Sequence, residues 1–276
     1  MKLTLCNEVL GTLPFAAQCQ LAKSLGYEGL ELAPFTLSDD PATLSTAQAQ
    51  QWAAIAQDHG LVITGLHWLL VKPDGLSITH PDLAVRQRTI AFMQHLCELC
   101  AALGGQYLVH GSPKQRLIHA GDTYELALGR ASECWAQAAQ AAQRFGVMYC
   151  IEPLSSDQTP LVNTLAQAVA VVRCVNHPNL RTMLDTSSAG LTEDLPVADL
   201  IDRWFPTGLI SHVQLNDPNR QGPGQGAMPF GPILAALKRH AYAGPLAVEP
   251  FEYVPDGPGC AARAAGYLQG LWESLA

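Results

Sequence analysis

Four acidic or amide side chains, Glu152, Asp185, Gln214 and Glu249, end short apolar segments in the second half of the sequence. Glu152 and Glu249 share a local pattern, Ile-Glu-Pro-Leu and Val-Glu-Pro-Phe. Since proline cannot donate a hydrogen bond to a sheet, each pattern marks the point where a strand leaves the sheet. Carboxylates that meet in space repel one another unless a cation neutralises them. The pattern therefore predicts a metal site.

The types of these four residues indicate which metal and which chemistry. Three carboxylates and an amide oxygen form a hard, oxygen-rich site, which favours one Mn²⁺ or Mg²⁺ per chain and tolerates Co²⁺. Such an ion polarises a carbonyl and stabilises an enediolate. Glu152 and Glu249 are then the candidate catalytic acid and base, one on each side of the substrate. The alternative for Gln214 is a hydrogen bond within the site, without metal contact.

Other polar residues near expected strand ends and in loops are candidates for binding the substrate. They are His67, Trp68, His110, Lys114, Arg116, His212 and Arg220. His212 lies two residues before Gln214, so both point the same way, with His212 one layer deeper and better suited to support than to ligation. For His67 and His110, a site role and a core position are equal alternatives, as are sugar stacking and packing for Trp68. The basic members could hold a phosphate or carboxylate, or simply be solvated.

Short apolar segments alternate with helical patterns along the whole sequence. The expected strands cover 3–7, 29–33, 61–67, 106–110, 147–152, 180–185, 209–215 and 246–249, and the expected helices cover 14–25, 46–59, 84–103, 122–145, 164–175, 195–204, 232–240 and 261–275. This alternation predicts a single α/β domain over 1–276 that closes as a (β/α)8 TIM barrel, whose strand ends share one bowl. An open doubly wound sheet is the alternative, but no Gly-x-Gly-x-x-Gly follows the first strand.

Composition and charge exclude several classes of protein. The chain has 276 residues, 48% of them hydrophobic, which excludes a disordered protein. The formal net charge of −8 argues against a nucleic-acid partner. No apolar run reaches the roughly 18 residues of a membrane span, and no signal peptide is evident, so we expect a cytoplasmic protein without membrane contact. The single Cys-x-x-Cys, Cys97 and Cys100, lies in a helical pattern, which favours core packing over a metal or redox role.

Several stretches give the sequence a specific likeness to known enzymes. They are Ile151–Leu154, Asn179–Thr186, His212–Arg220, Gly222–Gly226 and Tyr242–Glu249. Over nearly its whole length the chain resembles the xylose isomerase-like sugar isomerase/epimerase family, which includes ketose 3-epimerases, hydroxypyruvate isomerase and inosose dehydratase. The resemblance implies a TIM barrel with its metal held at positions 152, 185, 214 and 249. It also implies a small sugar or sugar-acid substrate and assembly into homodimers or homotetramers.

Three positions depart from the ketose 3-epimerase pattern, and one agrees with it. Gln214 stands where these epimerases have a ligating His, although hydroxypyruvate isomerase has Gln there. Ser188 replaces a substrate-binding His and Gln158 a substrate-binding Glu, whereas Arg220 matches a substrate-binding Arg. The resemblance thus implies a retained metal scaffold with altered substrate recognition.

The expected function is that of a metal-dependent isomerase or epimerase, which moves a proton through an enediolate on a ketose or small hydroxy-carbonyl compound. The alternatives are a metal-dependent dehydratase of the inosose or 3-dehydroshikimate type and a non-catalytic sugar-binding barrel. Endonuclease IV is a more distant member of the same superfamily. Ser188 and Gln214 replace two of its metal-binding histidines, which together with the negative charge argues against DNA repair.

Overall fold

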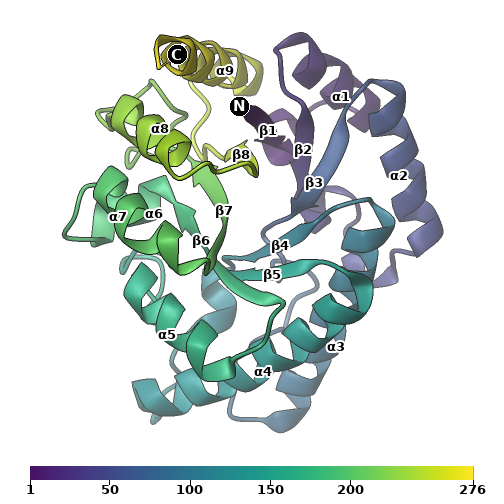
Figure 1. Cartoon of the computed structure of the whole chain (residues 1–276). Coiled ribbons are helices and arrows are strands. Elements are labelled where there is room, and N and C mark those ends of the chain that lie inside the picture. Colours follow the sequence, from purple (N-terminus) through teal and green to yellow (C-terminus); the bar gives the residue numbers. More distant parts are fainter. Residues whose placement is uncertain (276) are drawn as a thin grey trace.

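The strands of the protein close into a parallel barrel in the order β1 to β8 (Figure 1). A computed structural model describes residues 1–275. The strands are β1 (Lys2–Cys6), β2 (Gly29–Leu32), β3 (Val62–Leu66), β4 (Tyr107–His110), β5 (Met148–Ile151), β6 (Leu180–Asp185), β7 (Ile210–Leu215) and β8 (Pro245–Val248). The barrel closes because β8 pairs with β1, with Val248 opposite Leu5. The predicted TIM barrel is confirmed.

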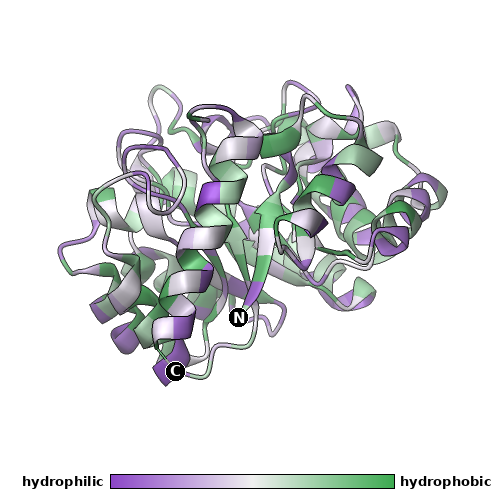
Figure 2. Ribbon diagram, turned by 90° about the horizontal axis from the view of Figure 1, so that it is seen from above, coloured by the Kyte–Doolittle hydropathy of each residue, from purple (hydrophilic) through white to green (hydrophobic). Residues whose placement is uncertain are grey.

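Helices surround the barrel on its outside (Figure 1). They are α1 (Phe15–Ser24), α2 (Thr46–Asp58), α3 (Leu83–Ala102), α4 (Tyr124–Phe145), α5 (Leu165–Val175), α6 (Thr186–Thr192), α7 (Val197–Trp204), α8 (Phe230–Arg239) and α9 (Gly257–Ser274). Hydrophobic residues concentrate in the strands, and hydrophilic residues on outer helix faces and loops (Figure 2). Within residues 1–275, no helix combines the length and apolar character needed to cross a membrane.

Helix α6 was not expected from the sequence. Its first turn, Thr186-Ser187-Ser188, consists of weak helix formers. The helix begins because Asp185, the last residue of β6, caps it by accepting a hydrogen bond from the backbone N–H of Ser188 at 2.6 Å. The same aspartate therefore ends a strand and starts a helix, which fixes its position at the barrel mouth.

Small boundary differences affect where the polar residues lie. The strands expected at 61–67, 147–152 and 246–249 each end one residue earlier. His67, Glu152 and Glu249 consequently follow their strands directly. The last helix begins at Gly257 rather than 261, because the Asp256 side chain caps it and Pro258 fits the first turn.

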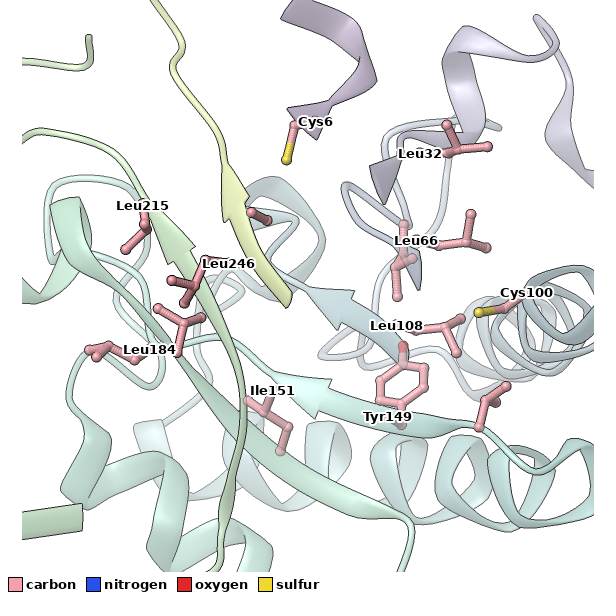
Figure 3. Close-up of a cluster of buried hydrophobic side chains, with 14 of the residues drawn as sticks. Cys6, Leu32, Leu66, Cys100, Leu108, Tyr149, Ile151, Leu184, Leu215 and Leu246 are labelled. Carbon is pink, nitrogen blue, oxygen red and sulfur yellow. The ribbon is translucent and has the colours of Figure 1, made fainter. Parts of the chain in front are cut away.

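Two hydrophobic layers hold these elements in place, since alternate strand residues point to opposite sides. Outward-facing Leu108, Tyr149 and Ile151 belong to the main core, together with Cys100 of α3 (Figure 3). A separate small cluster, which fills part of the barrel interior, consists of Tyr107, Val109, Cys150 and Met183. Cys97 and Cys100 are both free and fully buried in the main core, as a packing role requires. Buried polar side chains also lie on the strands, among them Thr4, Glu31, His212 and Gln214.

Candidate active site

Three carboxylates meet where β5, β6 and β8 end. They belong to Glu152, Asp185 and Glu249, which offer one oxygen each, and these oxygens all lie within 4.8 Å of one another. All three residues are buried. The structure thus brings together the acidic residues that the sequence placed at strand ends. Gln214 is adjacent, because it faces Asp185 in the register of β6 and β7.

Crowding and burial shift the protonation of these acids. Burial raises the pKa of Glu152 well above its ordinary value, and the neighbouring charges of Glu249 and Asp185 raise it further. Burial also raises the pKa of Asp185 to about 6, against hydrogen bonds that include the N–H of Ser188. Burial raises the pKa of Glu249 to about 8, although His67 opposes the rise. A cation at this point would relieve both the repulsion and the desolvation.

Unpaired oxygens show that the cluster suits a cation. Asp185 Oδ2, Gln214 Oε1 and Glu249 Oε2 are buried and have no hydrogen-bond partner among residues 1–275. Buried acceptors without donors are costly to leave unsatisfied, and a hard divalent ion binds such oxygens directly. The donor set therefore fits Mn²⁺ or Mg²⁺.

His67, which follows β3, contacts Glu249 of the cluster and also Glu8, which lies just past the end of β1. Its Nδ1 lies 2.9 Å from Glu249 Oε1, and its Nε2 lies 3.0 Å from Glu8 Oε2. Although burial acts to lower the pKa of His67, Glu8 and Glu249 raise it well above its ordinary value. The two carboxylates thus favour the protonated ring of His67, and its contact with Glu249 Oε1 holds Glu249 in place.

Glu31 is a buried carboxylate that the sequence-based set of site residues missed. Its Oε1 accepts a 2.7 Å hydrogen bond from Gln214 Nε2, and its Oε2 accepts one from the hydroxyl of Tyr107. His212 Nε2 lies 2.9 Å from Oε2 at ion-pair distance, without the alignment of a hydrogen bond. Burial acts to raise the pKa of Glu31, but His212 and His67 lower it to about 2. Its signal in the sequence is an acid within the apolar run Gly-Leu-Glu-Leu, which places Glu31 on the second expected strand.

A pocket opens beside the carboxylates. Besides Glu152 and Glu249, it is lined by Trp68, Gly111, Leu154, Gln158, Ser188 and Phe251. The rings of Trp68 and Phe251 meet edge to face, with their centroids 6.0 Å apart. Trp68 adopts a left-handed φ of 50°, which is unusual for a bulky residue and common at functional sites. A larger hollow, lined partly by Lys2, Lys23 and Glu28, lies away from the carboxylates at the opposite end of the barrel.

The candidate histidines differ in the direction of their side chains. His110 points outward, where Trp135 Nε1 donates to its Nδ1 at 3.2 Å and the Tyr149 hydroxyl lies 2.8 Å from the same atom. Burial and Arg116 lower the pKa of His110 to about 3, so it is neutral. His212 points inward but lies below the pocket, where its ring stacks on Tyr107 at 4.0 Å. Neither histidine lines the pocket, whereas His67 holds a residue that does.

The candidate basic residues also occupy three different environments. Arg116 is fully buried, and its Nη1 donates a 2.8 Å hydrogen bond to the backbone oxygen of Glu152. Burial lowers the pKa of Arg116 to about 10, so it remains charged beside Glu152. Lys114 is exposed. Arg220 is half exposed and lies 5.0 Å from the ring centre of the pocket residue Phe251.

This geometry coincides with the outcome of sequence comparison. Residues 19–271 match the family described as xylose isomerase-like TIM barrel. The chain belongs to this family. The residues that match the xylose isomerase-like family include β2 to β8, and so every strand that contributes to the carboxylate cluster.

Several relatives within the family have named activities. The D-psicose 3-epimerase of Agrobacterium fabrum is 29% identical over 245 residues, which cover 86% of this chain and 79% of the relative. A Streptomyces coelicolor protein provisionally named a hydroxypyruvate isomerase is 28% identical to this chain. The aligned residues cover 92% of this chain and 93% of that protein. A solved structure of D-psicose 3-epimerase with D-tagatose from Clostridium cellulolyticum has a TM-score of 0.82 at 22% identity, and covers 100% of this chain and 99% of its own.

Proposed function

We propose that the protein is a divalent-metal-dependent isomerase or epimerase, which acts on a ketose or a small hydroxy-carbonyl compound. The observation that carries the proposal is the meeting of three buried carboxylates beside a pocket, with unpaired oxygens on Asp185, Gln214 and Glu249. Family membership and the epimerases and isomerases among the relatives support the same activity.

Glu152, Asp185, Gln214 and Glu249 would hold the metal, Mn²⁺ or Mg²⁺. When bound, the ion would polarise the substrate carbonyl and stabilise negative charge on the oxygen atoms of the reacting carbons. The remaining chemistry belongs to the side chains. Glu152 and Glu249 both reach the pocket wall, where their carboxyl groups could take a proton from the substrate or give one to it.

In this mechanism one of the two glutamates removes the proton from the carbon next to the carbonyl, which gives an enediolate. Return of a proton to the same carbon from the opposite side is epimerisation, and return to the neighbouring carbon is isomerisation. His67 keeps Glu249 in place, and the charge of Arg116 favours the ionised form of Glu152. Trp68 and Phe251 would cover the sugar and limit the access of water.

Proton exchange in deuterated water tests this proposal. The protein is loaded with Mn²⁺ and incubated with D-psicose, D-fructose or hydroxypyruvate, and deuterium at the carbon next to the carbonyl is followed by NMR. We expect incorporation with at least one substrate, and its loss after chelation of the metal. Glu152→Gln and Glu249→Gln should each reduce exchange by about 100-fold or more, since general acid–base catalysis contributes about 10²–10⁴-fold.

Glu133→Gln, on the exposed face of α4, is the matched control and should retain full exchange. Formation of an ultraviolet-absorbing enone would identify a dehydratase instead. Binding of a sugar without any exchange would point to a non-catalytic barrel. Either result contradicts the proposal.

A further inference from the structure

The amide of Gln214 has a defined orientation in the barrel. We propose that Glu31 is a positioning residue that turns the oxygen of Gln214 toward the metal and its nitrogen away from it. The inference rests on the proposed function, because it concerns a ligand of the proposed metal. An amide group can turn either its oxygen or its nitrogen toward a metal, and only the oxygen is a ligand. Glu31 would explain why the oxygen of Gln214 is the atom that faces the metal.

The contacts of Glu31 leave Gln214 one favourable orientation. Glu31 is fully buried, and donors approach both of its oxygens. Tyr107 donates to Oε2, while Gln214 Nε2 donates to Oε1 at 2.7 Å. If the amide flipped, two acceptor oxygens would face each other without a proton between them, in a setting that excludes water.

The opposite end of the amide is the unpaired atom. Gln214 Oε1 is buried and has no hydrogen-bond partner within the described part of the chain. Gln214 and Asp185 are register partners on β7 and β6, and Asp185 also carries an unpaired oxygen. Each of these oxygens lacks a donor, and a cation bound at the mouth of β6 and β7 would satisfy both. Glu31 thus acts on the metal through Gln214, as partners of metal ligands commonly do.

Replacing the carboxylate by an amide tests this role. In Glu31→Gln, the new oxygen can still accept from Tyr107, and the new nitrogen then faces Gln214 Nε2. With residue 31 in this orientation the two nitrogens are both donors, and Gln214 then turns its oxygen toward residue 31 and its nitrogen toward the metal. An amide nitrogen is not a ligand for Mn²⁺. We expect the Kd for Mn²⁺, measured by electron paramagnetic resonance of the free ion, to rise about 10- to 100-fold.

A reversed pair separates positioning from structural support. In Glu31→Gln/Gln214→Glu, the nitrogen of residue 31 donates to the carboxylate at 214, which again offers an oxygen to the metal. We expect this double variant to bind Mn²⁺ about tenfold or more tightly than Glu31→Gln alone. Tyr107→Phe is the control, because it removes the donor on Glu31 Oε2 and leaves the bond to Gln214. It should bind Mn²⁺ as the wild type does.

The possible failures are distinguishable. If the wild type binds no Mn²⁺, the proposed function and this inference both fail. If the wild type binds Mn²⁺ and Glu31→Gln binds it equally well, only the inference fails. The inference also fails if the reversed pair recovers no affinity, or if Tyr107→Phe loses as much as Glu31→Gln, since Glu31 would then only support the fold. Melting temperatures of all variants establish that each is folded.

Discussion

At the scale of single residues, His67 shows how one buried side chain influences a carboxylate of the site. It contacts Glu249 and Glu8 from opposite sides of its ring. Its positive charge lowers the pKa of Glu249, against burial, which raises it. His67 therefore keeps Glu249 closer to the ionised form that a metal ligand and a base require.

Replacement of His67 should change the pH profile as well as the rate. In His67→Leu, Glu249 loses both its hydrogen bond and the neighbouring charge, so its pKa rises further. We expect kcat/KM to fall about 10- to 100-fold and the acidic limb of its pH profile to move to higher pH. His59→Leu, which changes the histidine that follows α2, is the control and should alter neither. An unchanged limb in His67→Leu would mean that His67 does not govern Glu249.

At the scale of elements, the site depends on close approach between strand ends. Asn216, directly after β7, joins three of them. Its Nδ2 donates to the backbone oxygen of Glu249, and its Oδ1 accepts from the backbone N–H of Ser187 in α6. Gly111, directly after β4, leaves the space that the Glu152 carboxylate occupies, because a Cβ at position 111 would clash with that carboxylate.

Gly111→Ala should separate activity from stability. A Cβ on Gly111 would lie 1.8 Å from Glu152 Oε2, and the flexible glutamate can move away at little cost to folding. We expect kcat to fall about tenfold to 100-fold through misplacement of Glu152, with the free energy of unfolding changed by less than about 1 kcal/mol. The control is Gly129→Ala in α4, where nothing lies within 4 Å of the added Cβ. A fully active Gly111→Ala enzyme would show that the exact position of Glu152 is unimportant.

At the scale of the whole molecule, the site joins both halves of the barrel. The proposed ligands lie at the carboxyl ends of β5 to β8, with Gln214 one residue before the end of β7, while His67 follows β3 and Glu31 lies on β2. Without metal, the raised pKa values of Asp185 and Glu249 mean that the folded state binds more protons than the unfolded chain at neutral pH. The free energy of unfolding then falls as pH rises from about 5 to 8.

Thermal unfolding with and without Mn²⁺ should display this linkage. For the metal-free protein we expect the melting temperature to decrease between pH 5 and 8, because Asp185 and Glu249 titrate at about 6 and about 8. A Mn²⁺ concentration of 100 times Kd adds about 2.7 kcal/mol, or about 5 to 10 °C. At one fixed Mn²⁺ concentration the gain should grow with pH, since protons compete with the metal and raise its Kd at low pH. A gain that is equal at pH 5.5 and 8 would place the metal away from these carboxylates.

The sequence by itself determined the architecture and the acidic part of the site. Alternating strands and helices specify a parallel barrel, whose strand ends must share one mouth. Glu152, Asp185 and Glu249 each end or follow a strand, so closure of the barrel alone brings them together. This part was predictable because it depends on position along the chain. Phe251 was missed because it lies past the strand end, and only the fold returns it to the pocket.

Only the tertiary structure decided which way the other polar side chains point and what they contact. His67 and His110 looked alike in the sequence, but one faces the barrel interior and the other faces α4 and β5. Likewise, the orientation of the Gln214 amide depends on Glu31, which is 183 residues away along the chain. These properties arise from contacts across the barrel, because burial removes the water that would otherwise satisfy each polar group independently.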